Sequence, residues 1–228
     1  MQGRHHVGHG IQCGYSASTS SHGIMERMNN VQVYDPAKLQ PPTGKFNAIV
    51  ALSDRDGGIG NKGTLPWPKL SKDLEYYQTL TSFTTDPSKK CVNIRGRLTW
   101  EAGTAAVKSH PRRLNVVISS KMAKRPEHVH HIAKSFEEAL SWSLAAEDAE
   151  NVWVLGGSNV YKTAMSSPLC HRVYVTRVFG EFESDVFFPE IDPEKFQHVR
   201  DEALVDTPFE ENGTRYQFEI YERKPVVQ

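Results

Sequence analysis

Cysteines and long apolar runs are scarce in this chain, and each scarcity excludes a class of protein. The 228 residues include only three cysteines, Cys13, Cys91 and Cys170, widely spaced and without a CxxC pair. An odd number at such spacings is typical of free thiols in a reducing compartment rather than of a disulfide framework. No stretch approaches the roughly 20 apolar residues that a membrane-spanning helix needs. We therefore expect no membrane partner.

Net charge is also absent, because 27 Lys and Arg residues balance 27 Asp and Glu residues. No basic tail or stripe interrupts this balance, so nothing in the charge pattern indicates nucleic-acid binding. The apolar fraction of 38% is enough for a real core at this length. The composition therefore predicts a soluble globular protein, with a monomer as the default state and no metal site assigned.

The first 44 residues differ from the rest. They begin with a Gly-, Ser- and His-rich stretch that has no acid before Glu26 and no periodic pattern. We expect this stretch to be disordered, and "KLQPPTG" at 38–44 to be a linker that ends the extension before Lys45. A mitochondrial presequence is the alternative to an untargeted tail in a cytoplasmic protein, since Arg4 lies in an acid-free, Ser-rich start.

From residue 45 to 225 short apolar runs alternate with amphipathic segments. Strands are predicted over 46–53, 114–119, 152–155 and 172–178, and helices over 71–83, 135–147 and 158–165. The first helix takes Ser71 as its expected N-cap. Such alternation predicts one α/β domain with a mainly parallel central sheet flanked by helices. The period-two stretch at 214–223 follows the turn signal "EENG" and predicts a C-terminal antiparallel hairpin.

Two of the strand ends run through glycine into a helix. Gly156 and Gly157 allow close approach of the backbone to a ligand, and the helix amides near Ser158 point toward an anion. Gly96 precedes Arg97 and Thr99 in the same way. Either glycine site alone is compatible with a simple tight turn. Two such sites on neighbouring strand ends favour a dinucleotide, since open α/β sheets bind ligands at the carboxyl ends of their strands.

The stretch "GGIGNKGTLPWPKLSKDLEYY" (57–77) carries a second kind of signal. Its flexible loop leads through Trp67 to a helix with Asp73 in the first turn. By spacing alone, Asp73 is a surface acid favoured by the helix dipole and Trp67 is a core aromatic.

At this stretch the chain resembles dihydrofolate reductase, especially the animal forms. The likeness covers about Phe46 to Glu222. Its motifs occur in the family's order: "AIVALS", "GIGNKGTLPWP", "GRLTWE", "NVVISS", "VWVLGGSNVYKTAM" and "VYVTRVFGEFESDVFFPEID".

The resemblance implies hydride transfer from NADPH to 7,8-dihydrofolate, giving tetrahydrofolate for one-carbon metabolism and thymidylate synthesis, and implies binding of antifolates. Asp73 would hold the pterin ring and polarise it, while solvent delivers the proton. Thr176 would support this carboxylate, and Trp67 would order a nearby water. Arg113 would grip the α-carboxylate of the glutamyl tail.

The resemblance also assigns the remaining site residues. Those implied for the substrate are Ile49, Leu74, Tyr77, Gln78, Leu155 and Tyr161. Those implied for NADPH are Ala51, Gly58, Ile59, Gly60, Gly63, Thr64, Gly96, Arg97, Leu98, Thr99, Ser119, Ser120, Lys121, Gly156, Gly157, Ser158, Asn159, Val160 and Tyr161. Among these, Ser119 to Lys121 would meet the adenosine 2′-phosphate.

Several positions depart from the family pattern. Tyr77 replaces a Phe, Leu98 a basic residue or a histidine, Gly103 a bulky aliphatic and His110 a Leu. Each lost apolar wall residue removes about 1–3 kcal/mol of substrate burial.

The largest departures are Asn93 and Arg95, which stand where the family has apolar residues in a central strand. Three outcomes are open: Arg95 reaches the cofactor phosphates, Arg95 finds a buried acid, or the domain is destabilised. An unpaired buried charge is costly. The resemblance places this face of the strand against a helix and away from the cofactor, which favours the second and third outcomes. Two alternative functions follow: a catalytically impaired relative that still binds nucleotide or folate, and, with a poorer fit, a reductase acting on a riboflavin-pathway pyrimidine.

Overall fold

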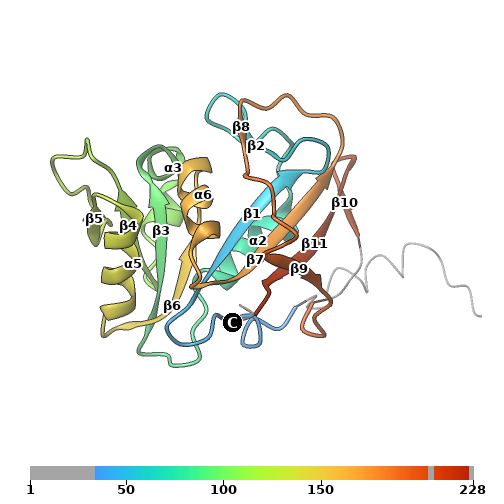
Figure 1. Cartoon of the computed structure of the whole chain (residues 1–228). Helices are drawn as coiled ribbons and strands as arrows, with labels where there is room; N and C mark the ends of the chain where they lie inside the picture. The colour runs from blue at the N-terminus through green and yellow to red at the C-terminus, as the bar shows by residue number, and fades with distance from the viewer. Residues whose placement is uncertain (1–33, 205–207, 226–228) are drawn as a thin grey trace, which may run out of the picture. The chain divides into compact units, whose positions relative to one another are not determined.

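The computed structural model describes residues 34–204 and 208–225. In these residues nine strands form one sheet with the order β10-β11-β7-β1-β6-β3-β4-β5, and β9 pairs with the outer side of β11 (Figure 1). A separate pair joins β2 to β8. The strands are β1 (Phe46–Ser53), β2 (Gly58–Gly60), β3 (Lys90–Gly96), β4 (Arg113–Ile118), β5 (His131–Ala133), β6 (Ala149–Val154), β7 (Cys170–Phe179), β8 (Val186–Phe187), β9 (Phe196–Val199), β10 (Phe209–Glu211) and β11 (Thr214–Arg223).

The sheet confirms the predicted fold class. β1, β3, β4, β5, β6 and β7 pair in parallel, whereas β11 runs antiparallel to β7 and forms a hairpin with β10. The helices are α2 (Ser71–Leu80), α3 (Arg97–Ala102), α4 (Ala105–Lys108), α5 (Phe136–Ala145) and α6 (Ser158–Ser166). The structure thus joins the antiparallel hairpin to the end of a parallel sheet.

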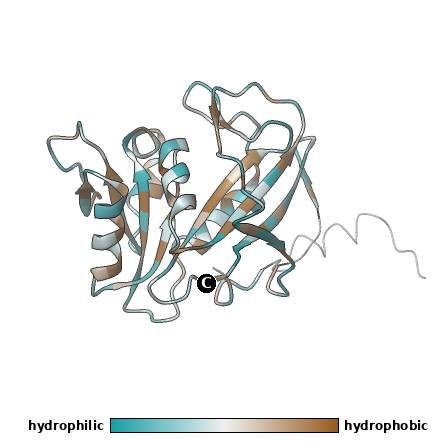
Figure 2. Cartoon of the chain, viewed as in Figure 1, coloured by the Kyte–Doolittle hydropathy of each residue, from teal (hydrophilic) through white to brown (hydrophobic). Residues whose placement is uncertain are grey.

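Helices cover both faces of the sheet, which explains why β1 reads as a nearly continuous apolar run. Phe46, Ala48, Val50 and Leu52 share a core cluster with residues of α5 and α6. Ile49 points the other way, into a second cluster with residues of α2. Figure 2 shows the apolar residues concentrated along the central strands.

The packed chain begins before the boundary predicted at Lys45. Leu39 is fully buried, and its carbonyl accepts hydrogen bonds from Tyr174 Oη at 2.9 Å and Asn47 Nδ2 at 3.3 Å. The linker predicted over 38–44 is therefore partly core, because "KLQPP" supplies an apolar side chain that the sheet buries. The predictions of disorder and of a targeting sequence for the N-terminal stretch fall on residues 1–33, outside the described residues. None of the described helices is long and apolar enough to cross a membrane.

Candidate active site

The first turn of α2 carries Asp73, and a remote residue caps this helix. Leu70, not Ser71, is the N-cap, and its side chain makes no capping bond. The Glu211 carboxylate, from β10, accepts instead from Ser71 N at 2.7 Å and Lys72 N at 3.0 Å. The capping prediction for Ser71 was wrong, because a carboxylate brought in by the hairpin satisfies the free amides.

The Asp73 carboxyl lies where ionisation is opposed. Burial raises its pKa to about 6, a hydrogen bond with Thr176 acts in the opposite direction, and the charge of Glu211 raises the pKa further. Thr176 is itself buried on β7. A carboxyl with a pKa near neutrality can be ionised at physiological pH while still exchanging a proton, which suits a site that binds a polar ring.

Several apolar and aromatic residues predicted for the site belong to the core: Ile49, Trp67 and Leu155 lie in the cluster that includes residues of α2, and Tyr161 lies in the other cluster. Ile49, Leu155, Tyr161 and Trp67 are all buried, and the Trp67 ring packs edge-to-face on Phe182 with centroids 5.7 Å apart. Trp67 Nε1 is buried and has no hydrogen-bond partner among the described residues. The indole N–H is thus a donor left over for a ligand or an ordered water. Leu74, Tyr77 and Gln78 lie partly exposed on α2.

The two glycine turns meet at adjacent strand ends. Gly96 N donates to Gly156 O at 2.7 Å, joining the turn after β3 to the turn after β6. Gly156 has φ of +94°, and a Cβ there would lie 2.5 Å from the Tyr161 ring. A Cβ on Gly157 would lie 3.1 Å from Thr99 Oγ1. We call Gly96, Gly156 and Gly157 the glycine cradle, because side chains at these positions would occupy the space that a ligand needs. The cradle and the first amides of α6, at Ser158, Asn159 and Val160, fit a phosphate group of a dinucleotide.

A short path connects the cradle to the carboxylate. Tyr161, which packs against Gly156, donates its hydroxyl to Ile49 O at 2.7 Å. Two residues along β1, Ala51 pairs with Thr176, the partner of Asp73. The structure therefore brings the predicted substrate and cofactor residues of β1, α6 and β7 together.

Other predicted cofactor residues are engaged by the protein itself. Arg97 Nη1 bonds both carboxylate oxygens of Glu101, at 2.7 and 2.8 Å, and Leu98 is 70% exposed. Ser158 Oγ donates to Phe187 O at 2.6 Å. Glu101 lies one helical turn after Arg97, so this ion pair is a local one that the i,i+4 spacing explains.

The loops predicted to contact the nicotinamide and the 2′-phosphate form ordered turns. Ser119 Oγ accepts from Lys121 N at 3.1 Å, leaving Ser120 and Lys121 exposed beyond the carboxyl end of β4. In β2, a Cβ on Gly58 would lie 2.0 Å from Ser184 Oγ. Ile59 and Gly60 continue this strand, and Gly63 and Thr64 form the turn that follows, in which Thr64 exchanges backbone hydrogen bonds with Asn61.

Arg113 is held against the other end of α2. Its Nη2 donates to Gln78 O at 3.0 Å and Thr81 Oγ1 at 2.8 Å, and its Nε donates to Thr81 O at 3.3 Å. The guanidinium also lies 5.7 Å from the centre of the Tyr77 ring. Carbonyl groups at a helix C-terminus attract a cation, which accounts for this placement. Tyr77, Gln78 and Arg113, all predicted for the substrate, are therefore neighbours.

Asn93 and Arg95 are accommodated without an acid. Asn93 Nδ2 donates to Thr81 O at 3.1 Å, and Arg95 Nη2 donates to Asn115 Oδ1 at 3.3 Å. Neither the cofactor turn nor a carboxylate bonds Arg95 among the described residues, so the expected buried acid is absent there. Asn115 was missed by sequence reasoning, although it is an amide inside an apolar strand, the same signal that Asn93 gave.

The fold and the site together define a class of protein. A mainly parallel sheet, a glycine cradle across two strand ends and a buried carboxylate with a raised pKa describe a dinucleotide-dependent α/β oxidoreductase.

The chain belongs to the dihydrofolate reductase family, whose model matches residues 45–223. It is 40% identical over 182 residues to dihydrofolate reductase of Sus scrofa, covering 78% of this chain and 97% of that protein. It is also 40% identical over 187 residues to the Aedes albopictus enzyme, covering 79% of this chain and 98% of that one. A solved structure of Schistosoma mansoni dihydrofolate reductase is similar with a TM-score of 0.67 at 32% identity, covering 78% of this chain and 97% of that chain.

Proposed function

We propose that this protein catalyses the NADPH-dependent reduction of 7,8-dihydrofolate to tetrahydrofolate, which supplies one-carbon metabolism and thymidylate synthesis. One observation carries the proposal: Asp73, with its pKa raised to about 6, bonds Thr176, and Thr176 pairs with β1, the strand whose Ile49 carbonyl bonds the Tyr161 that packs against the glycine cradle. Membership of the family, together with relatives that bear this enzyme's name, supports the same assignment. Its products and substrates are small molecules, and we propose a monomer in the cytoplasm.

NADPH supplies the hydride when it is bound, with its phosphates at the Gly96, Gly156 and Gly157 cradle and the first amides of α6. The ionised Asp73 accepts hydrogen bonds from the amino group and ring nitrogen at one edge of the pterin and fixes the ring's orientation. The apolar side chains of Ile49 and Leu155 exclude water from the ring faces. Solvent delivers the proton to the reduced ring, since Asp73 contacts the opposite edge.

The test is the loss of turnover on removing the Asp73 charge. Asp73→Asn keeps the side chain's size but cannot carry the charge, so the rate of NADPH oxidation with dihydrofolate near neutral pH should fall about 100-fold or more. Glu75→Gln, on the exposed side of the same helix, is the matched control and should keep the original rate. Normal turnover in Asp73→Asn would contradict the proposed role.

A further inference from the structure

Two guanidinium groups are buried on adjacent strands without an acid. Arg95 on β3 and Arg113 on β4 are each 2% exposed. Cys91 pairs with Arg113 and Arg95 with Val117, so both arginine side chains lie on the same face of the sheet. Within residues 34–204 and 208–225, neither guanidinium contacts a carboxylate. Buried charges are normally paired, so this pair lacks a counter-ion.

A series of hydrogen bonds through Asn115 and α4 connects the Arg95 guanidinium to the Arg113 guanidinium. Arg95 pairs with Val117 on β4 but bonds Asn115, which lies on the same strand between Val117 and Arg113. Asn115 Nδ2 then donates to Lys108 O at 2.9 Å, and Arg113 Nη1 donates to Val107 O at 3.3 Å. Arg113 thus bonds a carbonyl of α4 directly, and Arg95 is linked to the next carbonyl along that helix through the Asn115 side chain. Burial lowers the pKa of Arg113, Tyr77 opposes this effect, and the charge of Arg95 lowers the pKa further, as expected for nearby like charges.

Arg95 and Arg113 differ in how many of their N–H groups already donate hydrogen bonds to the protein. Arg113 makes four hydrogen bonds to neutral acceptors of α2, its following turn and α4. Arg95 makes a single one, and its buried Nε has no partner among the described residues. The Arg95 guanidinium otherwise lies 5.7 Å from the centre of the Trp100 ring. Arg95 thus retains N–H groups that an incoming anion can use.

A third cation lies on the same aromatic ring. Lys108 Nζ is 5.4 Å from the centre of the Trp100 ring and donates to Glu101 O at 3.2 Å. Its stem fills the space beside Gly103, where a Cβ would lie 3.6 Å from Lys108 Cε. The Glu101 carboxylate is engaged by Arg97. The local charge around Trp100 is therefore positive.

We propose that Arg95 is a specificity-determining residue for the acidic end of the substrate, acting with Arg113 on a tail that carries two carboxylates. The inference rests on the proposed function, together with the role that the family resemblance implies for Arg113 at the glutamyl end of dihydrofolate. That end has an α- and a γ-carboxylate, and Arg113 alone matches one of them. Arg95 supplies positive charge and free donors for the second, and the tail supplies the missing counter-charge.

The test compares a tailed and a tail-less substrate in Arg95→Met, a neutral residue of similar length. With dihydrofolate the KM should rise about tenfold, the equivalent of about 1.4 kcal/mol, with kcat changed less than about twofold. With 6-methyl-7,8-dihydropterin, which has no carboxylate, the KM should stay unchanged. A variant that keeps the charge, Arg95→Lys, should keep most of the preference for the tailed substrate.

Arg112→Met is the matched control, because the Arg112 guanidinium bonds Thr84 Oγ1 and Pro87 O, away from the series of hydrogen bonds through Asn115 and α4. It should leave both KM values unchanged. Equal effects of Arg95→Met on the two substrates, or no effect on dihydrofolate, would overturn the inference. Equilibrium binding of the two compounds without NADPH gives the same comparison if the protein shows no turnover, so failure of this inference and failure of the proposed function are distinguishable.

Discussion

At Asp73, the carboxylate that we propose binds the pterin in its ionised form, burial raises the pKa from 3.8 to about 6. Keeping such a group charged at neutral pH costs folding free energy, because the unfolded chain ionises it more readily. Between pH 4 and pH 6 the folded chain holds a proton on Asp73 that the unfolded chain has mostly released. The contribution of Asp73 to the free energy of unfolding therefore falls as the pH rises from about 4 to about 6. Function and stability therefore conflict at this residue.

Asp73→Asn should be more stable than the original protein at pH 7 while losing activity. The expected gain in free energy of unfolding is on the order of 2–3 kcal/mol, at about 1.4 kcal/mol per pKa unit. Urea denaturation at pH 7 and at pH 4 measures it. The difference should shrink at pH 4, because the folded chain is then almost fully protonated at this carboxyl and the unfolded chain, near its pKa of 3.8, is protonated roughly half of the time. An equal difference at both pH values would contradict this account.

At the scale of elements, α2 is held at both ends by charged residues from distant strands. Glu211 accepts from the amides of Ser71 and Lys72, and Arg113 donates to Gln78 O and Thr81 O beyond the last turn. An acid at the N-terminus and a base at the C-terminus both complement the helix dipole. Burial opposes ionisation of Glu211, but the hydrogen bonds from Tyr216, Lys72 and Ser71 outweigh it, so its pKa is below the ordinary value. This frame sets the position of Asp73 and Tyr77.

Glu211→Gln should weaken the N-terminal frame and shift the pH profile of the site. Loss of the charged cap should cost about 1 kcal/mol of stability. Loss of its negative charge should also lower the pKa of Asp73, so the acid limb of the rate profile should move to lower pH. Denaturation and the pH dependence of kcat/KM measure the two effects.

Glu210→Gln is the matched control for this prediction, since Glu210 is exposed on the same strand and makes no contact with α2 that the structure records. It should change neither the stability nor the profile. An unshifted acid limb in Glu211→Gln would show that the Glu211 charge does not act on Asp73.

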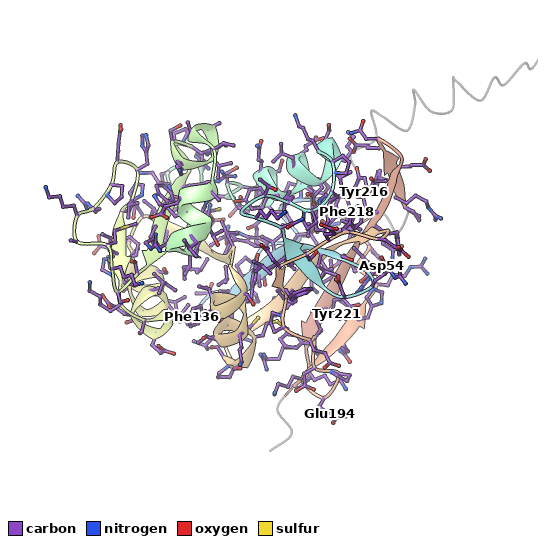
Figure 3. The ribbon with its side chains drawn as sticks, turned by 90° about the horizontal axis from the view of Figure 1, so that it is seen from above. Asp54, Phe136, Glu194, Tyr216, Phe218 and Tyr221 are labelled. Carbon is purple, nitrogen blue, oxygen red and sulfur yellow. The ribbon has the colours of Figure 1, made fainter. Side chains whose placement is uncertain are left out.

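At the scale of the whole molecule, residues 34–39 extend the core beyond the family match. Tyr34 packs edge-to-face on Tyr76 of α2 with centroids 4.9 Å apart, and Tyr76 stacks on Phe218 of β11 at 4.2 Å. Figure 3 labels Phe218 beside Tyr216 on that strand, and these rings are 6.1 Å apart. The family match begins at residue 45. Residues that precede the matched range therefore pack against α2 and stabilise it.

Leu39→Ala should therefore destabilise the domain although it lies in a segment that reads as a linker. Removing a fully buried Leu side chain costs about 2–5 kcal/mol, with a loss in melting temperature to match. Leu144→Ala, at a side chain that is 39% exposed, should change stability by less than about 1 kcal/mol. Equal melting temperatures for Leu39→Ala and the original protein would show that residues 34–39 do not contribute to the core.

The sequence by itself determined the fold class, the positions of the long central strands and of α2, α5 and α6, and the glycine cradle. These follow from local features: apolar runs and periodicity, and glycines at strand ends before helices, as in β1 and at Gly156. It also marked Asp73 and Arg113, but only through motifs that resemble a family. The tertiary structure alone decided that Glu211 caps α2, that Leu39 is core, and that Arg95 contacts Asn115 rather than an acid. Each of these depends on residues distant in sequence meeting in space, and no local pattern encodes which partner a buried polar group will find.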